Sequence, residues 1–152
     1  MKDTDKIIMS SESIISPRDS IQIDSGWKPT GLWYSFGTEW IDWVDCNMPD
    51  WKEDNIHEIE IDYTKILRLG LDMSVDSFEN KYGRETFLKG AITEIDWSLV
   101  ESDGYHGIEI KHPWSKEIGN WLRTWDISSG CIWNKKSIKS VNNLKQIKDT
   151  II

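Results

Sequence analysis

The nine residues Lys28–Phe36, with the sequence KPTGLWYSF, decide the fold that we expect for this chain. The proline fixes its own φ and keeps the preceding lysine extended, and the Thr-Gly pair that follows is typical of a turn. The run LWYSF is too short for an ordinary helix and is rich in residues that favour strands. We therefore predict a buried strand over residues 31–36. Its polar side chains, Tyr34 and Ser35, then need hydrogen-bond partners in the protein or in a ligand.

The whole-chain composition predicts one acidic globular domain. The chain has 152 residues and a net charge of −8, which suits a single domain with a sizeable core. Because phosphate neutralisation supplies most of the affinity of non-specific nucleic-acid binding, the acidic charge argues against that function. We expect the domain over residues 1–133. Residues 134–152 contain five lysines and one acid, and we interpret them as a basic tail, with a helix from about Val141.

The sequence contains no pattern typical of a disulfide framework, a metal site or a membrane span. Its two cysteines and three histidines do not have the spacing of known zinc sites. The first apolar segment, residues 7–9, is too short for a signal peptide or a transmembrane helix. We expect a cytoplasmic protein with reduced thiols, no metal and no membrane partner.

Hydrophobic alternation and capping residues predict the remaining elements. Strands are expected over residues 6–10, 21–23, 56–63, 65–69 and 108–110, with a bend or hairpin between 56–63 and 65–69 and a closing hairpin of 121–125 with 131–133. Helices are expected over residues 39–46, from the cap Ser74 to Gly83, and over 96–102. Since strands and helices do not alternate regularly, the class is α+β and not a doubly wound parallel sheet.

Glu109 is the acid that we favour as a chemical group. It lies between two isoleucines of an alternating strand, so it faces away from both, toward solvent or into a cleft. The preceding turn, Gly104–Gly107, contains glycines that allow a ligand to approach the backbone. The alternative is an exposed glutamate on an edge strand.

Three stretches, in this order along the chain, resemble ADP-ribosyltransferase-like domains: KIIMSS at residues 6–11, GLWYS at 31–35 and IEI at 108–110. In those families an early strand carries Arg or His before small hydroxyl residues, a second strand is aromatic and ends in Ser, and a late strand carries Glu. Met9 replaces the usual Arg or His. The resemblance implies two small packed mixed or antiparallel sheets with a few short helices. The motifs KPxGLW and WDxxSGCIW also resemble a group of uncharacterised phage and bacterial proteins.

The resemblance implies a mono-ADP-ribosyltransferase that uses NAD as its substrate. It would cleave the nicotinamide–ribose bond and transfer ADP-ribose to an acceptor, either a macromolecule or a small molecule. Glu109 would stabilise the positive charge on the ribose, Tyr34 would stack on the nicotinamide, and Ser35 would hydrogen-bond to Glu109. The implied NAD-binding residues are Ser10, Ser11, Lys28, Gly31, Leu32, Trp33 and Trp40.

Two other functions stay open because ten tryptophans suit both a binding groove and a packed core. One is a non-enzymatic module whose tryptophan-lined groove binds a peptide, glycan or nucleotide. The other is an interaction protein, such as a phage or host-defence accessory factor, with tryptophans largely in its core. The enzyme hypothesis requires Ser35 and Glu109 to face one cleft.

Overall fold

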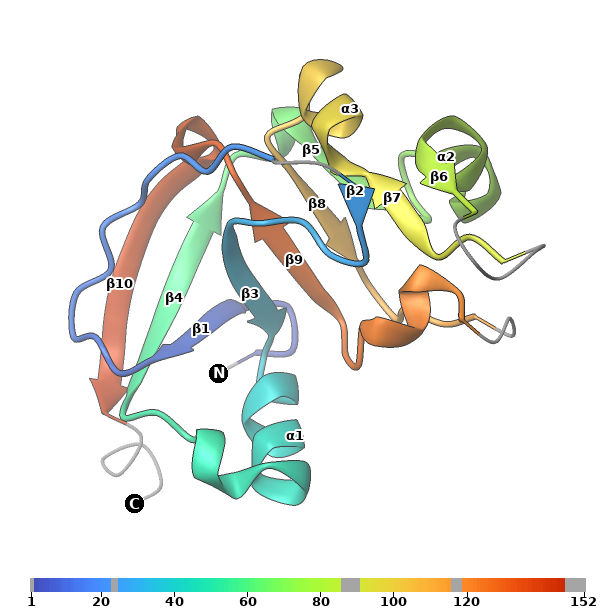
Figure 1. Cartoon of the computed structure of the whole chain (residues 1–152). Coiled ribbons are helices and arrows are strands. Elements are labelled where there is room, and N and C mark those ends of the chain that lie inside the picture. Colours follow the sequence, from blue (N-terminus) through green and yellow to red (C-terminus); the bar gives the residue numbers. More distant parts are fainter. Residues whose placement is uncertain (1, 23–24, 86–90, 116–118, 147–152) are drawn as a thin grey trace.

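The computed structural model describes residues 2–22, 25–85, 91–115 and 119–146 and has a mixed α+β fold (Figure 1). Seven strands form one sheet in the order β10-β4-β1-β3-β9-β8-β5. Neighbouring strands are antiparallel except β5 and β8, which are parallel. The bounds are β1 Lys6–Ser10, β3 Leu32–Phe36, β4 Asn55–Ile61, β5 Ile66–Leu69, β8 Gly107–Ile110, β9 Ser129–Ile132 and β10 Ile138–Gln146.

A second, three-stranded sheet has the order β2-β7-β6. Its strands are β2 Ser25–Gly26, β6 Gly83–Arg84 and β7 Glu94–Asp96. The α-helices are α1 Glu39–Asn47, α2 Val75–Tyr82 and α3 Trp97–Ser102, and the 3-10 turns are η1 Pro49–Trp51, η2 Tyr63–Lys65, η3 Trp121–Thr124 and η4 Lys135–Ser137. Within the described ranges, no helix has both the length and the apolar character that crossing a membrane requires.

The large sheet must curl strongly, because a short link joins two strands that are far apart in its order. Ile61 ends β4 and Ile66 begins β5, and an extended chain between them spans at most about 18 Å. Five strand spacings of about 4.8 Å would separate these strands by about 24 Å in a flat sheet. The curl brings one end of the sheet together, where the Asp62 N–H donates to the Ser137 carbonyl and the His106 N–H to the Lys65 carbonyl, both at 2.8 Å.

Each face of the curled sheet has its own core. The inner, concave face buries a mostly aliphatic cluster with two aromatic rings: Ile8, Tyr34, Phe36, Ile59, Ile61, Ile66 and Ile132. The outer face of β5, β8 and β9 packs against α2, α3, η3 and the small sheet. This second core holds the buried tryptophans Trp97, Trp121, Trp125 and Trp133. Many of the tryptophans are therefore packing residues.

The α+β class and most of the predicted elements are confirmed. The strands predicted over 6–10, 31–36, 56–63, 65–69 and 108–110 correspond to β1, β3, β4, β5 and β8. The three predicted helices correspond to α1, α2 and α3, and the capping side chains of Ser74 and Asp96 accept hydrogen bonds from the N–H groups of Ser77 and Leu99. The two sheets are of unequal size: the larger one has seven strands and the smaller one has three.

Three predictions about elements are wrong: the closing hairpin with its strand over 121–125, the helix from Val141 and the strand over 21–23. Residues 121–124 form η3 because the Asn120 side chain caps this turn and both Trp121 and Leu122 are buried, which a half-buried strand does not allow. In place of the hairpin, β9 pairs with β3 and β8. Of the bend or hairpin expected between residues 56–63 and 65–69, only the hairpin is excluded, because β5 pairs with β8 and not with β4.

The helix expected from Val141 is also wrong. Residues 138–146 instead form β10 on β4, and Ile138 and Val141 pack against the concave core. Residues 147–152 lie outside the described residues. Ile21 and Gln22 belong to no strand, and residue 23 also lies outside the described part.

Candidate functional site

Strand β3 sends the predicted site residues to opposite faces of the sheet. Tyr34 belongs to the concave core, and its cross-strand neighbour on β9 is Gly130, which is in turn opposite Glu109 on β8. Ser35, the next residue, points to the other face and its Oγ donates to the Ile7 carbonyl at 3.5 Å. The expected hydrogen bond between Ser35 and Glu109 is therefore not formed, and the two residues do not share a cleft.

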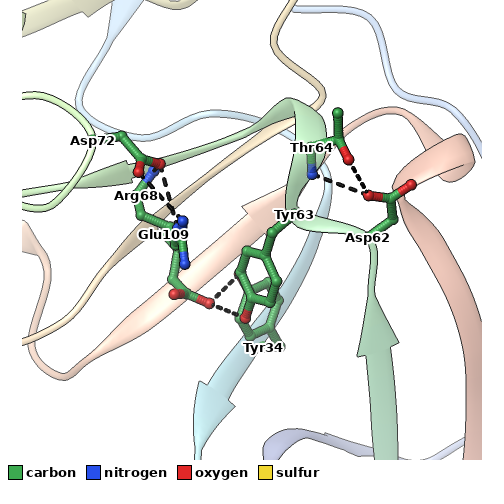
Figure 2. Close-up of polar contacts among 7 residues, drawn as sticks. All are labelled: Tyr34, Asp62, Tyr63, Thr64, Arg68, Asp72 and Glu109. Carbon is green, nitrogen blue, oxygen red and sulfur yellow. Dashed lines mark hydrogen bonds and ion pairs between the residues drawn. The ribbon is translucent and has the colours of Figure 1, made fainter.

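Glu109 is held by two tyrosine hydroxyls on the concave face (Figure 2). The hydroxyls of Tyr34 and Tyr63 both donate to Glu109 Oε1, at 2.8 and 2.6 Å. Glu109 is 8% exposed and Tyr34 2%. A buried carboxylate needs such donors, because an unpaired charge in the interior is costly.

Gly130 makes this contact possible. An added Cβ at this position would lie 2.3 Å from both Cζ and the hydroxyl oxygen of Tyr34. The tyrosine ring therefore lies directly across β9, and only a residue without a side chain leaves it room to reach Glu109.

The surroundings keep both tyrosines protonated. Burial, followed by the charge of Glu109, raises the pKa of Tyr34 well above its usual value. Burial and the hydrogen bond to Glu109 raise the pKa of Tyr63 in the same way. Arg68, the neighbour of Glu109 on β5, lies 5.2 Å from the centre of the Tyr63 ring and forms an ion pair with Asp72 at 3.4 Å (Figure 2). Because both tyrosine hydroxyls and the carboxylate have partners within the chain, we conclude that this cluster stabilises the fold.

A cavity of about 400 Å³ lies on the face opposite to Glu109, against β1, β3 and β9. Among the residues that line it are three tryptophans, two serines and two residues of opposite charge: Trp33, Trp40, Trp125, Ser35, Ser129, Lys28 and Asp126. Tyr34 borders it too, but its hydroxyl is committed to Glu109 on the other face. We refer to this space as the tryptophan cavity.

Trp125 is the exceptional side chain of the tryptophan cavity. It is 3% exposed, and its buried Nε1 has no hydrogen-bond partner among the described residues. The other three buried tryptophans do have partners for their Nε1 groups: Trp97 with the Gly26 carbonyl, Trp121 with Glu79 and Trp133 with the Tyr105 carbonyl. Since buried polar groups are normally paired, this N–H is exceptional among the buried tryptophans of the described residues.

The remaining predicted residues divide between the tryptophan cavity and the framework. Met9 lines the cavity, at the position where the resemblance expects the first-strand motif. Lys28 Nζ lies 5.7 Å from the centre of the Trp33 ring. Leu32 packs in the concave core, and Gly31 allows β3 to approach β9, because a Cβ there would lie 2.5 Å from the Ile132 oxygen.

The two predicted serines of the first strand motif lie away from the tryptophan cavity, and several residues that line it were missed. Neither Ser10 nor Ser11 lines it, and Ser10 Oγ accepts from the Glu12 N–H. Among the missed residues are Trp125, Asp126, Ile127 and Ser129. All four belong to the motif WDxxSGCIW, so the sequence contained a signal for them but no indication of their role.

No family model, curated protein or solved structure matches this chain. Among the described residues, no group of three or more His, Cys, Asp or Glu side chains could hold a metal ion. The case for a function therefore depends on the tryptophan cavity and on the resemblance of the three strands.

Replacing Gly130 by alanine is expected to destabilise the fold, because the new methyl group would displace the Tyr34 ring or push β9 away. Overpacking of this kind costs about 1–3 kcal/mol of unfolding free energy, which urea titration measures. The control is Gly26→Ala, where a Cβ finds only the Lys28 oxygen at 3.9 Å. Equal losses in the two variants would contradict the packing of Tyr34 across Gly130.

The tyrosine cluster predicts a loss of stability at alkaline pH. A free tyrosine titrates near 10.0, whereas the folded chain holds the protons of Tyr34 and Tyr63 to higher pKa values. The unfolded chain thus releases protons first, so this stabilisation is complete below pH 10 and is lost as the pH rises above it. Urea titrations across that range should show a smaller decline in the free energy of unfolding for Tyr34→Phe than for the wild type. An unchanged decline in Tyr34→Phe, matching that of the control Tyr105→Phe, would refute the role of this cluster.

Proposed function

We propose that the protein binds a nucleotide in the tryptophan cavity, with NAD as the candidate that the strand resemblance names. The observation that carries this proposal is the buried Nε1 of Trp125, which has no partner among the described residues, on a residue that lines a cavity of about 400 Å³. Small-molecule sites commonly measure about 300–1,000 Å³ and combine apolar walls with a few polar groups. The tryptophan cavity accommodates a heteroaromatic base with its ribose.

The side chains around the tryptophan cavity complement the parts of a nucleotide. Tryptophan faces stack on flat heterocycles, and the Trp125 N–H supplies a donor for a ring nitrogen or a carboxamide oxygen. The hydroxyls of Ser35 and Ser129 each donate to a backbone carbonyl, so their oxygens remain able to accept from an amide or a ribose hydroxyl. The exposed Lys28 provides a cation for phosphate.

The ADP-ribosyltransferase-like fold is part of the same proposal. The first two strands of the resemblance, β1 and β3, are neighbours in the sheet, and residues of both line the tryptophan cavity. The strand next to β3 on its other side is β9 and not the Glu109 strand β8. The adjacency of β1 and β3 at the tryptophan cavity is what supports this part of the proposal. In the proposed site, β9 and the residues before it take the place that the resemblance gives to the Glu109 strand.

Titration with NAD tests the binding proposal. We expect NAD to raise the melting temperature and to change the tryptophan fluorescence of the wild type. Trp33→Ala should weaken the affinity at least about tenfold, as the loss of a stacking side chain does. The matched control is Trp114→Ala, because Trp114 is 69% exposed and lies outside the tryptophan cavity. Absence of any response to NAD, AMP and nicotinamide mononucleotide would contradict the proposal.

Cleavage of bound NAD is a second candidate function, favoured by the acid at the tryptophan cavity. Asp126 is the only carboxylate among the described residues that line it. In the reaction, the bond between the nicotinamide nitrogen and ribose C1′ breaks, and the bonding electrons leave with nicotinamide. An acceptor hydroxyl then attacks C1′ and releases its proton. The Asp126 carboxylate would stabilise the positive charge that develops on the ribose.

The rate at which the purified protein releases nicotinamide shows which of the two acids, Asp126 or Glu109, takes part in the reaction. Asp126→Asn should lower the rate by at least about a hundredfold, while Glu109→Gln should retain it as long as the variant stays folded, which its melting curve reports. The binding measurement serves as the control that Asp126→Asn still takes up NAD. Loss of release in folded Glu109→Gln together with full activity in Asp126→Asn would contradict the assignment of Asp126.

A further inference from the structure

The surface formed by α1 and η1 carries a row of three tryptophans, which we term the aromatic row: Trp40, Trp43 and Trp51. The rings of Trp40 and Trp43 are stacked, with centroids 5.2 Å apart and planes inclined by 7°. Trp51 continues the row at 6.1 Å from Trp43 and is 51% exposed. Figure 1 shows α1 and η1 together beyond the end of β3, away from the small sheet.

Little of this surface is used to build the core. Val44 is the single buried residue of α1, and η1 has none. Met48, between the two elements, is 37% exposed. Large apolar side chains that remain accessible side by side are typical of a surface that binds a partner.

The aromatic row is surrounded by negative charge. Residues 38–54 contain six acids and one lysine, and that lysine, Lys52, is already paired with Asp45 at 3.0 Å. The acids, all exposed, are Glu39, Asp42, Asp45, Asp50, Glu53 and Asp54. This charge repels phosphates and therefore disfavours a nucleic acid as the occupant.

We infer that the α1–η1 surface docks a segment rich in arginine or lysine from a partner protein. Indole faces attract cations more strongly than other aromatic rings, and the surrounding carboxylates complement the same positive groups. The indole faces and the surrounding carboxylates thus both favour a positively charged partner. Trp40 also lines the tryptophan cavity, so the two proposed sites share this residue. The inference does not depend on the nucleotide proposal, because Trp51 and Asp50, at which it is tested, do not line the cavity.

The test uses a synthetic peptide of alternating arginine and glycine and an otherwise identical peptide with glutamate in place of arginine. Isothermal titration should show binding of the arginine peptide alone, weakening as the salt concentration rises. Trp51→Ala and Asp50→Asn should each reduce the affinity at least about fivefold. Both residues are exposed, so these variants should fold.

Matched control variants remove the same groups elsewhere on the surface: Trp114→Ala for the exposed tryptophan and Asp76→Asn for one exposed acid. The affinity for the arginine peptide should be unchanged in both. Equal losses in control and test variants would show that only the overall charge attracts the peptide, and would overturn the inference.

Two further outcomes would also overturn the inference. One is binding of an oligosaccharide, but not of the arginine peptide, in a manner that depends on Trp51. The other is a dimer of the chain itself that light scattering detects and that Trp51→Ala abolishes. Loss of NAD binding in Trp33→Ala with intact peptide binding would leave the docking surface standing, so the two proposals can fail separately.

Discussion

Strand β3 divides the molecule into two sites, because successive side chains of a strand leave opposite faces of the sheet. Tyr34 points into the concave face and reaches across Gly130 to Glu109. Ser35 points outward to the tryptophan cavity. The short link between β4 and β5 forces the sheet to curl, which brings Tyr63 to the same carboxylate. The polar cluster at Glu109 thus stabilises the curled sheet, while the opposite face carries the tryptophan cavity.

The tryptophans of the chain have distinct physical roles. Trp97, Trp121 and Trp133 are buried with their N–H groups paired, so they belong to the core. Trp125 packs against Trp121 at 6.0 Å and against Trp33 at 5.0 Å. It therefore connects the core to the tryptophan cavity, with an N–H group that finds no partner in the described chain. Some of the tryptophans therefore belong to the packed core, and others line the tryptophan cavity.

Local sequence patterns predicted the elements well but not the pairing between distant strands. Alternation and capping identified β1, β3, β4, α2 and α3, since each depends on neighbouring residues alone. Alternation also implies that Tyr34 and Ser35 cannot both face Glu109, so that error was avoidable. The proximity of Asp126 and Lys28 was not predictable, because it depends on β3 pairing with β9, about a hundred residues later in the chain. β10 was missed because its polar sequence has strand structure only when β4 pairs with it.

In the function proposed above, the N–H of Trp125 binds a ligand in the tryptophan cavity. The most direct measurement is the indole N–H region of the ¹⁵N NMR spectrum, with the Trp125 signal assigned by its disappearance in Trp125→Phe. Addition of NAD should shift this signal downfield, as formation of a hydrogen bond does, and leave the Trp97 signal in place. A Trp125 signal that does not move while NAD binds elsewhere would contradict the claim.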